Sequence, residues 1–130
     1  YMLHHIELYV SNLNRSKQFW GWLLEDVLNY EKYQEWERGF SYKYESMYIV
    51  FVQTEQRFLE PSYHRCRVGL NHLAIQVSNR EKVDEITKLL EQRELKILYK
   101  NSHPFAGGND HYAVYFEDPD RIKVEIVAMS

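Results

Sequence analysis

The chain has 130 residues, 45% of them hydrophobic and 15% aromatic, and a formal net charge of −3 at pH 7. These values predict one packed globular domain and exclude a disordered chain. Charges of both signs are interspersed, so we expect no nucleic-acid partner and no membrane partner. No apolar run is long enough to span a bilayer, and we expect no leader before the first strand.

The first half of the chain predicts a strand, a helix and three further strands. Residues 5–10 alternate apolar side chains with His5, Glu7 and Tyr9, which places these three on one face of the strand. Ser11 or Asn12 can cap the helix that follows. The three strands expected after the helix cover residues 28–36, 40–44 and 47–52.

The second half repeats this order. His72 opens an alternating strand that ends in Ser-Asn, as His5 does in the first half. A helix is expected to start near Arg80, followed by strands at residues 95–99, 111–116 and 122–128. Internal similarity on this scale indicates two equivalent modules. We therefore expect an α+β fold of two βαβββ modules, at about residues 1–53 and 69–130, joined by a linker at about 54–68.

The alternation also predicts which polar side chains share a face. On the last strand, Glu125 lies opposite the apolar set, as His5 and His72 do on theirs. If the apolar faces pack under the helices, all three point to the concave side of the sheets. Two imidazoles and one carboxylate suit Zn, Mn, Ni, Co or Fe(II), and they leave coordination positions open for water or substrate.

Cys66 is the only cysteine. An intrachain disulfide is thereby excluded, and a reducing, cytoplasmic location is expected. The flanking residues Arg65 and Arg67 can lower the pKa of a thiol, but no base is evident beside it in the sequence. Its role stays open.

Three motifs and one helix carry a resemblance to a known family. The motifs are residues 3–10, 69–75 and 116–126, the last with the turn Asp118-Pro119-Asp120, and the helix covers residues 16–24. On these segments the chain resembles the vicinal oxygen chelate superfamily, which includes glyoxalase I, extradiol dioxygenases, fosfomycin-resistance transferases and bleomycin-binding proteins. The resemblance extends over essentially the whole chain.

The resemblance implies an open, barrel-like cup with a divalent metal held by His5, His72 and Glu125. It further implies a homodimer and a small-molecule substrate that chelates the metal through oxygen atoms. Glyoxalase-type members carry a second glutamate on the last strand of the first module. The local match of residues 50–52 to 124–126 places Phe51 there, which lowers the expectation of an authentic glyoxalase I.

The reaction type is left open among lyase or isomerase, dioxygenase and transferase, because one fold serves all of them. Glu7 and His111 are the candidates for proton transfer, Glu7 from the His5 face and His111 from the start of a strand beside a glycine loop. The alternative is a metal-free protein of the bleomycin-resistance type, which sequesters an aromatic ligand. The many aromatic residues of the first module favour this alternative.

Overall fold

A computed structural model describes all 130 residues, and the chain divides into two compact units, Tyr1–Ser62 and Tyr63–Ser130. The first holds β1 (His5–Val10), α1 (Leu13–Trp20), η1 (Gly21–Val27), β2 (Glu31–Trp36), β3 (Gly39–Tyr44), β4 (Met47–Gln53) and the short η2 (Gln56–Phe58). The second holds β5 (His72–Val77), α2 (Arg80–Gln92), β6 (Ile97–Leu98), β7 (Ala113–Glu117) and β8 (Lys123–Ala128). The predicted α+β fold of two βαβββ modules is confirmed.

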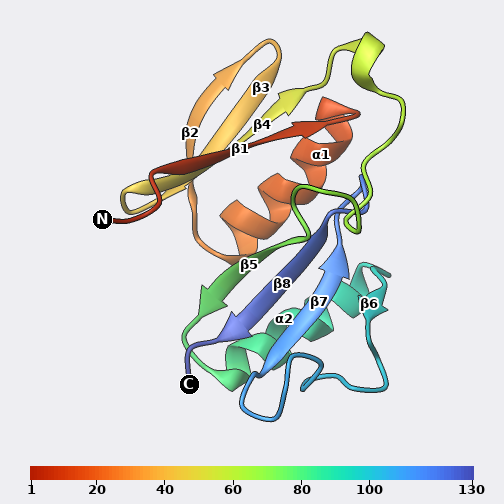
Figure 1. Cartoon of the computed structure of the whole chain (residues 1–130). Coiled ribbons are helices and arrows are strands. Elements are labelled where there is room, and N and C mark those ends of the chain that lie inside the picture. Colours follow the sequence, from red (N-terminus) through yellow and green to blue (C-terminus); the bar gives the residue numbers. More distant parts are fainter. The chain divides into compact units, whose positions relative to one another are not determined.

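Each module is a four-stranded sheet that is covered on one face by a helix. The strand order is β1-β4-β3-β2 in the first module and β5-β8-β7-β6 in the second. The first strand of each module pairs in parallel with the last, and the other pairs are antiparallel. In each module one helix packs along one face of the sheet (Figure 1).

The Ser-Asn repeat marks the start of each helix. The Asn12 side chain accepts a hydrogen bond from the backbone N–H of Arg15 at 3.1 Å, and Asn79 accepts one from Lys82 at 2.9 Å. Both asparagines therefore cap a helix by satisfying a free amide of its first turn. The first helix continues past Trp20 as the seven-residue π-helical segment η1.

The core of each module lies between its helix and its sheet. The largest fully buried side chains come from these facing surfaces: Trp20, Leu23, Leu24 and Phe51 in the first module, and Ile86, Leu90, Phe116 and Ile126 in the second. Because side chains alternate along a strand, His5 and His72 take the opposite face of their sheets. The predicted separation of the two histidines from the apolar set is confirmed.

Four strands are shorter than predicted, and residues with left-handed backbone lie near the ends of two of them, β2 and β6. Asn29 has φ 62° just before β2, and Glu94 (φ 59°) and Tyr99 (φ 56°) flank β6. Such residues cannot continue a strand. The predicted strand at 111–116 begins at Ala113, which leaves His111 in the preceding loop.

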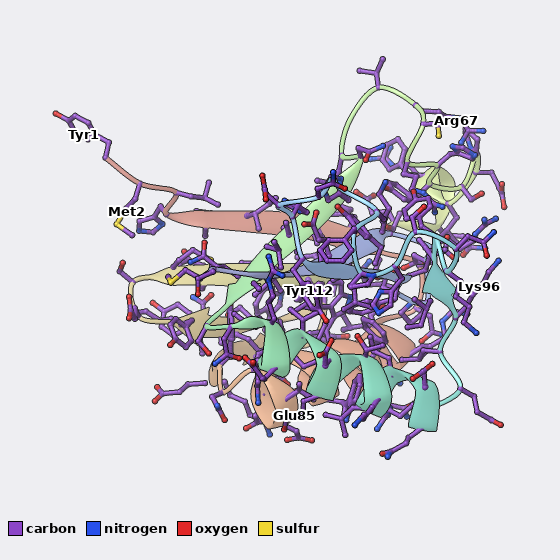
Figure 2. All side chains as sticks on the ribbon, turned by 90° about the horizontal axis from the view of Figure 1, so that it is seen from below. Tyr1, Met2, Arg67, Glu85, Lys96 and Tyr112 are labelled. Atoms are coloured by element: carbon purple, nitrogen blue, oxygen red, sulfur yellow. The ribbon has the colours of Figure 1, made fainter.

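Several residues at the surface show how the N-terminus and α2 are arranged. Tyr1 and Met2 lie on an extended segment before β1, and Glu85 projects from α2 away from the strands of its sheet (Figure 2). Tyr112 hydrogen-bonds Asp84 of α2 at 2.6 Å. No helix of the structure combines the length and apolarity needed to cross a membrane.

Candidate metal centre

Glu125 is the carboxylate around which the polar groups of the second module gather. It lies on β8, where it pairs with Ala74 of β5 and Tyr115 of β7, and only 3% of its surface is exposed. His72 Nε2 lies 3.0 Å from Glu125 Oε1, and His111 Nε2 contacts the other oxygen, Oε2. The structure thus brings two of the predicted metal ligands, His72 and Glu125, together within one module.

Asn71 fixes the orientation of the His72 ring. Its Nδ2 donates to the carbonyl oxygen of Arg65 at 3.1 Å, which leaves Oδ1 to face His72 Nδ1 at 2.8 Å. Since a carbonyl oxygen only accepts, His72 Nδ1 must carry the proton. In the neutral ring the lone pair is then on Nε2, directed at the Glu125 carboxylate.

The contact between His72 and Glu125 has the chemistry of a cation site. A nitrogen lone pair and a carboxylate oxygen 3.0 Å apart repel each other unless a proton or a metal cation lies between them. Metal–nitrogen and metal–oxygen bonds of about 2.0–2.2 Å put neighbouring ligand atoms roughly 3 Å apart. The donor set, its spacing and the fixed tautomer therefore fit a divalent metal ion.

Tyr115 is a member of this centre that the sequence did not single out. It is buried on β7 beside Glu125, to which its hydroxyl is hydrogen-bonded. Burial, followed by the negative charge of Glu125 and this hydrogen bond, raises the pKa of Tyr115 to about 12. At neutral pH its hydroxyl is protonated and donates to the carboxylate. Tyr115 is the antiparallel partner of Glu125, and this strand pairing is the signal that could have identified it.

His111 reaches Glu125 from the loop before β7, and a glycine makes room for its ring. A Cβ atom placed on Gly107 would lie 2.4 Å from His111 Cδ2 and 2.9 Å from the Tyr115 hydroxyl. A larger residue at Gly107 would require the His111 ring or the Tyr115 hydroxyl to shift. The structure thus places His111 beside Glu125, and its role in proton transfer stays a prediction.

Asp118 organises the turn before β8, the strand that carries Glu125. Asp118 is buried, and its Oδ1 accepts from the backbone N–H groups of Asp120 (2.9 Å) and Ile122 (2.8 Å). Arg121 adopts φ 66°, a left-handed conformation that favours glycine. The turn thus explains the Asp-Pro-Asp motif as a structural device that starts the strand carrying Glu125.

In the first module, His5 has a different environment. It is exposed, its ring stacks on that of Tyr48 at 4.7 Å and 5°, and its Nδ1 lies 2.8 Å from Nδ1 of His4. Glu7 is exposed two residues further along β1, and its side chain makes no hydrogen bond or ion pair. The proposed roles of His5 as a ligand and of Glu7 in proton transfer stay predictions.

The register corrects one sequence-based assignment. Phe51 pairs with Leu8, and the equivalent of Leu8 in the second module, Ile75, pairs with Ile126. Phe51 is therefore the counterpart of Ile126, with its side chain in the core. The first-module counterpart of Glu125 is Val50, which pairs with Glu7 as Glu125 pairs with Ala74. The earlier match was wrong by one residue, because a shift of one reverses the faces of a strand.

Val50 is apolar, so the first module still lacks the second glutamate. In the structure, no group of three or more His, Cys, Asp and Glu side chains is arranged to hold a metal ion. Within the second module, His72 and His111 contact different oxygens of Glu125.

Comparison with known proteins gives consistent matches over the chain. Residues 2–126 match the model of the Glyoxalase/Bleomycin resistance protein/Dioxygenase superfamily. The chain is 56% identical over 128 residues to the uncharacterized protein YqjT of Bacillus subtilis, covering 98% of this chain and 99% of that protein. It is 60% identical to a candidate glyoxalase of known structure from Bacillus halodurans, with a TM-score of 0.94 over 98% of this chain and 95% of that one.

A more distant structure shares the fold alone. It is the genomically encoded fosfomycin resistance protein FosX from Listeria monocytogenes, at 22% identity and a TM-score of 0.69. The alignment covers 100% of this chain and 94% of that chain.

Proposed function

Because the chain belongs to the Glyoxalase/Bleomycin resistance protein/Dioxygenase superfamily, we propose that it is a divalent-metal-dependent enzyme acting on a small substrate that binds metal through oxygen atoms. His72 and Glu125 are the proposed ligands of the second module, and His5 is the proposed ligand of the first. The observation that carries this proposal is the buried Glu125 carboxylate facing the Nε2 lone pair of His72.

The structure supports the proposal through the way His72 is held. Asn71 accepts a hydrogen bond from His72 Nδ1 and donates one to the Arg65 carbonyl. These two bonds fix the orientation of the ring, with Nε2 directed at Glu125. Arg65 is anchored in turn by its ion pair with Glu117 at 2.5 Å. Partners of this kind around a ligand histidine typically raise metal affinity 10–100-fold.

When bound, such a metal acts as a Lewis acid that stabilises negative charge on substrate oxygens. The chain's own groups then bind and orient the substrate and handle its protons. Tyr115 holds a proton on its hydroxyl at neutral pH, since its pKa is raised to about 12. His111, with 41% of its side chain exposed against 34% for His72, is the more exposed imidazole beside Glu125 and is our candidate for moving a proton.

Val50 bears on the reaction type. A carboxylate at this position would add a fourth protein ligand or a base, and valine can be neither. The proposed set of two histidines and one glutamate leaves positions for two substrate oxygens. We therefore favour a reaction in which the substrate chelates the metal, and we leave lyase, dioxygenase and transferase as its possible forms. A homodimer, which the resemblance implies, belongs to the proposal.

The competing proposal is a metal-free binding protein. The exposed aromatic side chains on the sheet of the first module favour it, because apolar surface of this kind commonly marks a ligand site. The two proposals differ in whether metal binds at all.

Metal content decides between them. We expect protein purified without chelator to carry metal close to one ion per chain, and its thermal midpoint to rise on addition of Mn²⁺, Zn²⁺, Ni²⁺, Co²⁺ or Fe²⁺. His72→Ala is expected to lower occupancy steeply while the fold is retained. His64→Ala, which removes an exposed imidazole from the same module, is the matched control. Absence of metal and an unchanged midpoint with all five ions would contradict the enzyme proposal.

A further inference from the structure

An aromatic and basic cluster surrounds His5 on the sheet of the first module. Tyr48 lies beside His5 on β4 and stacks on its ring, and the Tyr33 ring of β2 approaches Tyr48 at 5.0 Å. Lys43 of β3 places its Nζ 4.5 Å from the centre of the Tyr33 ring. Three strands thus contribute to one surface, which we call the Tyr33 platform (Tyr33, Lys43 and Tyr48).

A β-bulge brings Tyr33 into this surface. The pairing of β2 with β3 shifts between Lys32 and Gln34, so Tyr33 is an additional residue without a partner on β3. Gln34 donates its backbone N–H to the buried Ser41 hydroxyl at 3.0 Å, and that hydroxyl donates back to Gln34 Oε1 at 3.2 Å. A bulge lets two consecutive side chains share a face. Gln34 is bound to Ser41, and Tyr33 is left to face Tyr48.

The cation of the platform has no acidic partner. No carboxylate lies within ion-pair distance of Lys43 Nζ, although Glu31 is its neighbour across the strand pair. Its ammonium lies over the ring of Tyr33, a residue that is 47% exposed. An unpaired ammonium beside an open aromatic face offers both charge and stacking to a planar anion.

Sheet packing alone explains only part of this arrangement. Cross-strand aromatic pairs stabilise sheets, which accounts for contact between Tyr33 and Tyr48. Such pairing does not explain why the buried Ser41 maintains a bulge beside the exposed Tyr33. It also does not explain why Lys43 has no carboxylate partner. Bulges of this kind are frequent beside functional sites, where they redirect a side chain.

We propose that the Tyr33 platform is a subsite for an aromatic carboxylate portion of the substrate, with the ring stacked on Tyr33 and Tyr48 and the carboxylate facing Lys43. The proposal rests on the proposed function in that it assigns this surface, beside the proposed ligand His5, to the substrate. It narrows the substrate class to small molecules in which an aromatic acid accompanies the oxygens that bind metal.

Three probes separate the contributions of charge and ring. They are 2-naphthoate, the neutral 2-naphthamide and the non-aromatic cyclohexanecarboxylate, titrated into the full chain by calorimetry, without metal and with Mn²⁺ present. We expect 2-naphthoate to bind more tightly than either of the others. Lys43→Met is expected to weaken 2-naphthoate about fivefold and to leave 2-naphthamide unchanged.

Control variants and Mn²⁺ titrations separate an effect on probe binding from an effect on folding or on metal binding. Lys32→Met removes an exposed lysine of β2 outside the platform and should change nothing. Tyr33→Leu should weaken both naphthyl probes, while Mn²⁺ affinity stays as in the wild type for Tyr33→Leu and Lys43→Met. Equal binding of all three probes, or an unchanged affinity for 2-naphthoate in Lys43→Met, would overturn the subsite. Loss of Mn²⁺ binding with the probe pattern retained would instead overturn the metal proposal.

Discussion

The two modules share a fold and a strand register but differ at almost every polar position that the register makes equivalent. Val50, Ser41 and Lys43 of the first module correspond to Glu125, Tyr115 and Glu117 of the second. The first module therefore presents an aromatic and cationic surface, whereas the second presents a carboxylate with hydrogen-bond donors around it. The apolar faces of the two sheets thus preserve the same fold in both modules, while the residues on the opposite faces differ.

One similarity remains beside each histidine. In both modules the preceding residue contacts Nδ1 of the histidine at 2.8 Å, His4 in the first module and Asn71 in the second. Asn71 can only accept there because its amide nitrogen is bound to Arg65. His4 can donate or accept, depending on its tautomer. The tautomer is therefore fixed for His72 and adjustable for His5.

The largest expected effect comes from exchanging the residues at the equivalent positions. Val50→Glu buries a carboxylate near Glu7 with no donor arranged for it, and we expect a loss of roughly 3 kcal/mol or more in the free energy of unfolding. Glu125→Val leaves the buried Tyr115 hydroxyl without its acceptor, but its other partners His72 and His111 remain partly exposed, and we expect a loss of about 2 kcal/mol. Urea unfolding of the metal-free proteins measures both. Equal losses would mean that the two positions are not as different as the register indicates.

The next effect tests the asymmetry beside the histidines. Asn71→Leu frees the His72 tautomer, and we expect metal affinity to fall about 10–100-fold. His4→Leu removes an exposed imidazole whose contact water can replace, and we expect a change of no more than about threefold. Metal titration gives the affinities, and ¹⁵N chemical shifts of His72 report its tautomer. A uniform loss in both variants with an unchanged tautomer would show that Asn71 has no specific role.

The smallest effect concerns the ion pairs of Glu117 with Arg65 and Arg121 in the second module. The equivalent residue of the first module, Lys43, forms no ion pair. Burial alone would raise the pKa of Glu117, but hydrogen bonds and charge from Arg65 and Arg121 outweigh it and lower the pKa. A lowered pKa in the folded state gives stability that is present above the ordinary value of 4.5 and is lost as the pH falls through the folded value. We expect Glu117→Gln to unfold about 1 kcal/mol more easily at pH 7.

The same variant has a defined pH profile. The difference between Glu117→Gln and the wild type should close as the pH falls well below 4.5. Lys43→Met, at the equivalent position of the first module, should leave the acid side of the profile unchanged. Thermal unfolding between pH 3 and 7 tests both. A difference that persists at pH 3 would assign the effect to packing and not to charge.

Much of the fold follows from the sequence because it depends on periodic patterns. Strand alternation placed His5, His72 and Glu125 away from the apolar faces, and the Ser-Asn repeats marked the helix starts that Asn12 and Asn79 cap. Strand ends were less predictable, because left-handed residues such as Glu94 and Tyr99 are set by tertiary context.

The details of the candidate site were less accessible to sequence. The register assignment of Phe51 failed because two neighbouring apolar residues, Val50 and Phe51, match the second module almost equally well until the hydrogen-bonded partners are known. Tyr115 was not singled out, since its importance comes from lying opposite Glu125 across two strands. The bulge at Tyr33 depends on a bond to Ser41 that no local pattern reveals.

The central claim is that the second module supplies His72 and Glu125 to a metal ion and the first module supplies His5. Pulsed electron paramagnetic resonance of the Mn²⁺-loaded protein tests it directly, since imidazole nitrogens bound to Mn²⁺ give resolved hyperfine couplings. The account predicts couplings from two imidazoles in the wild type and from one in His5→Ala and in His72→Ala. Two couplings retained in either variant, or none in the wild type, would contradict it.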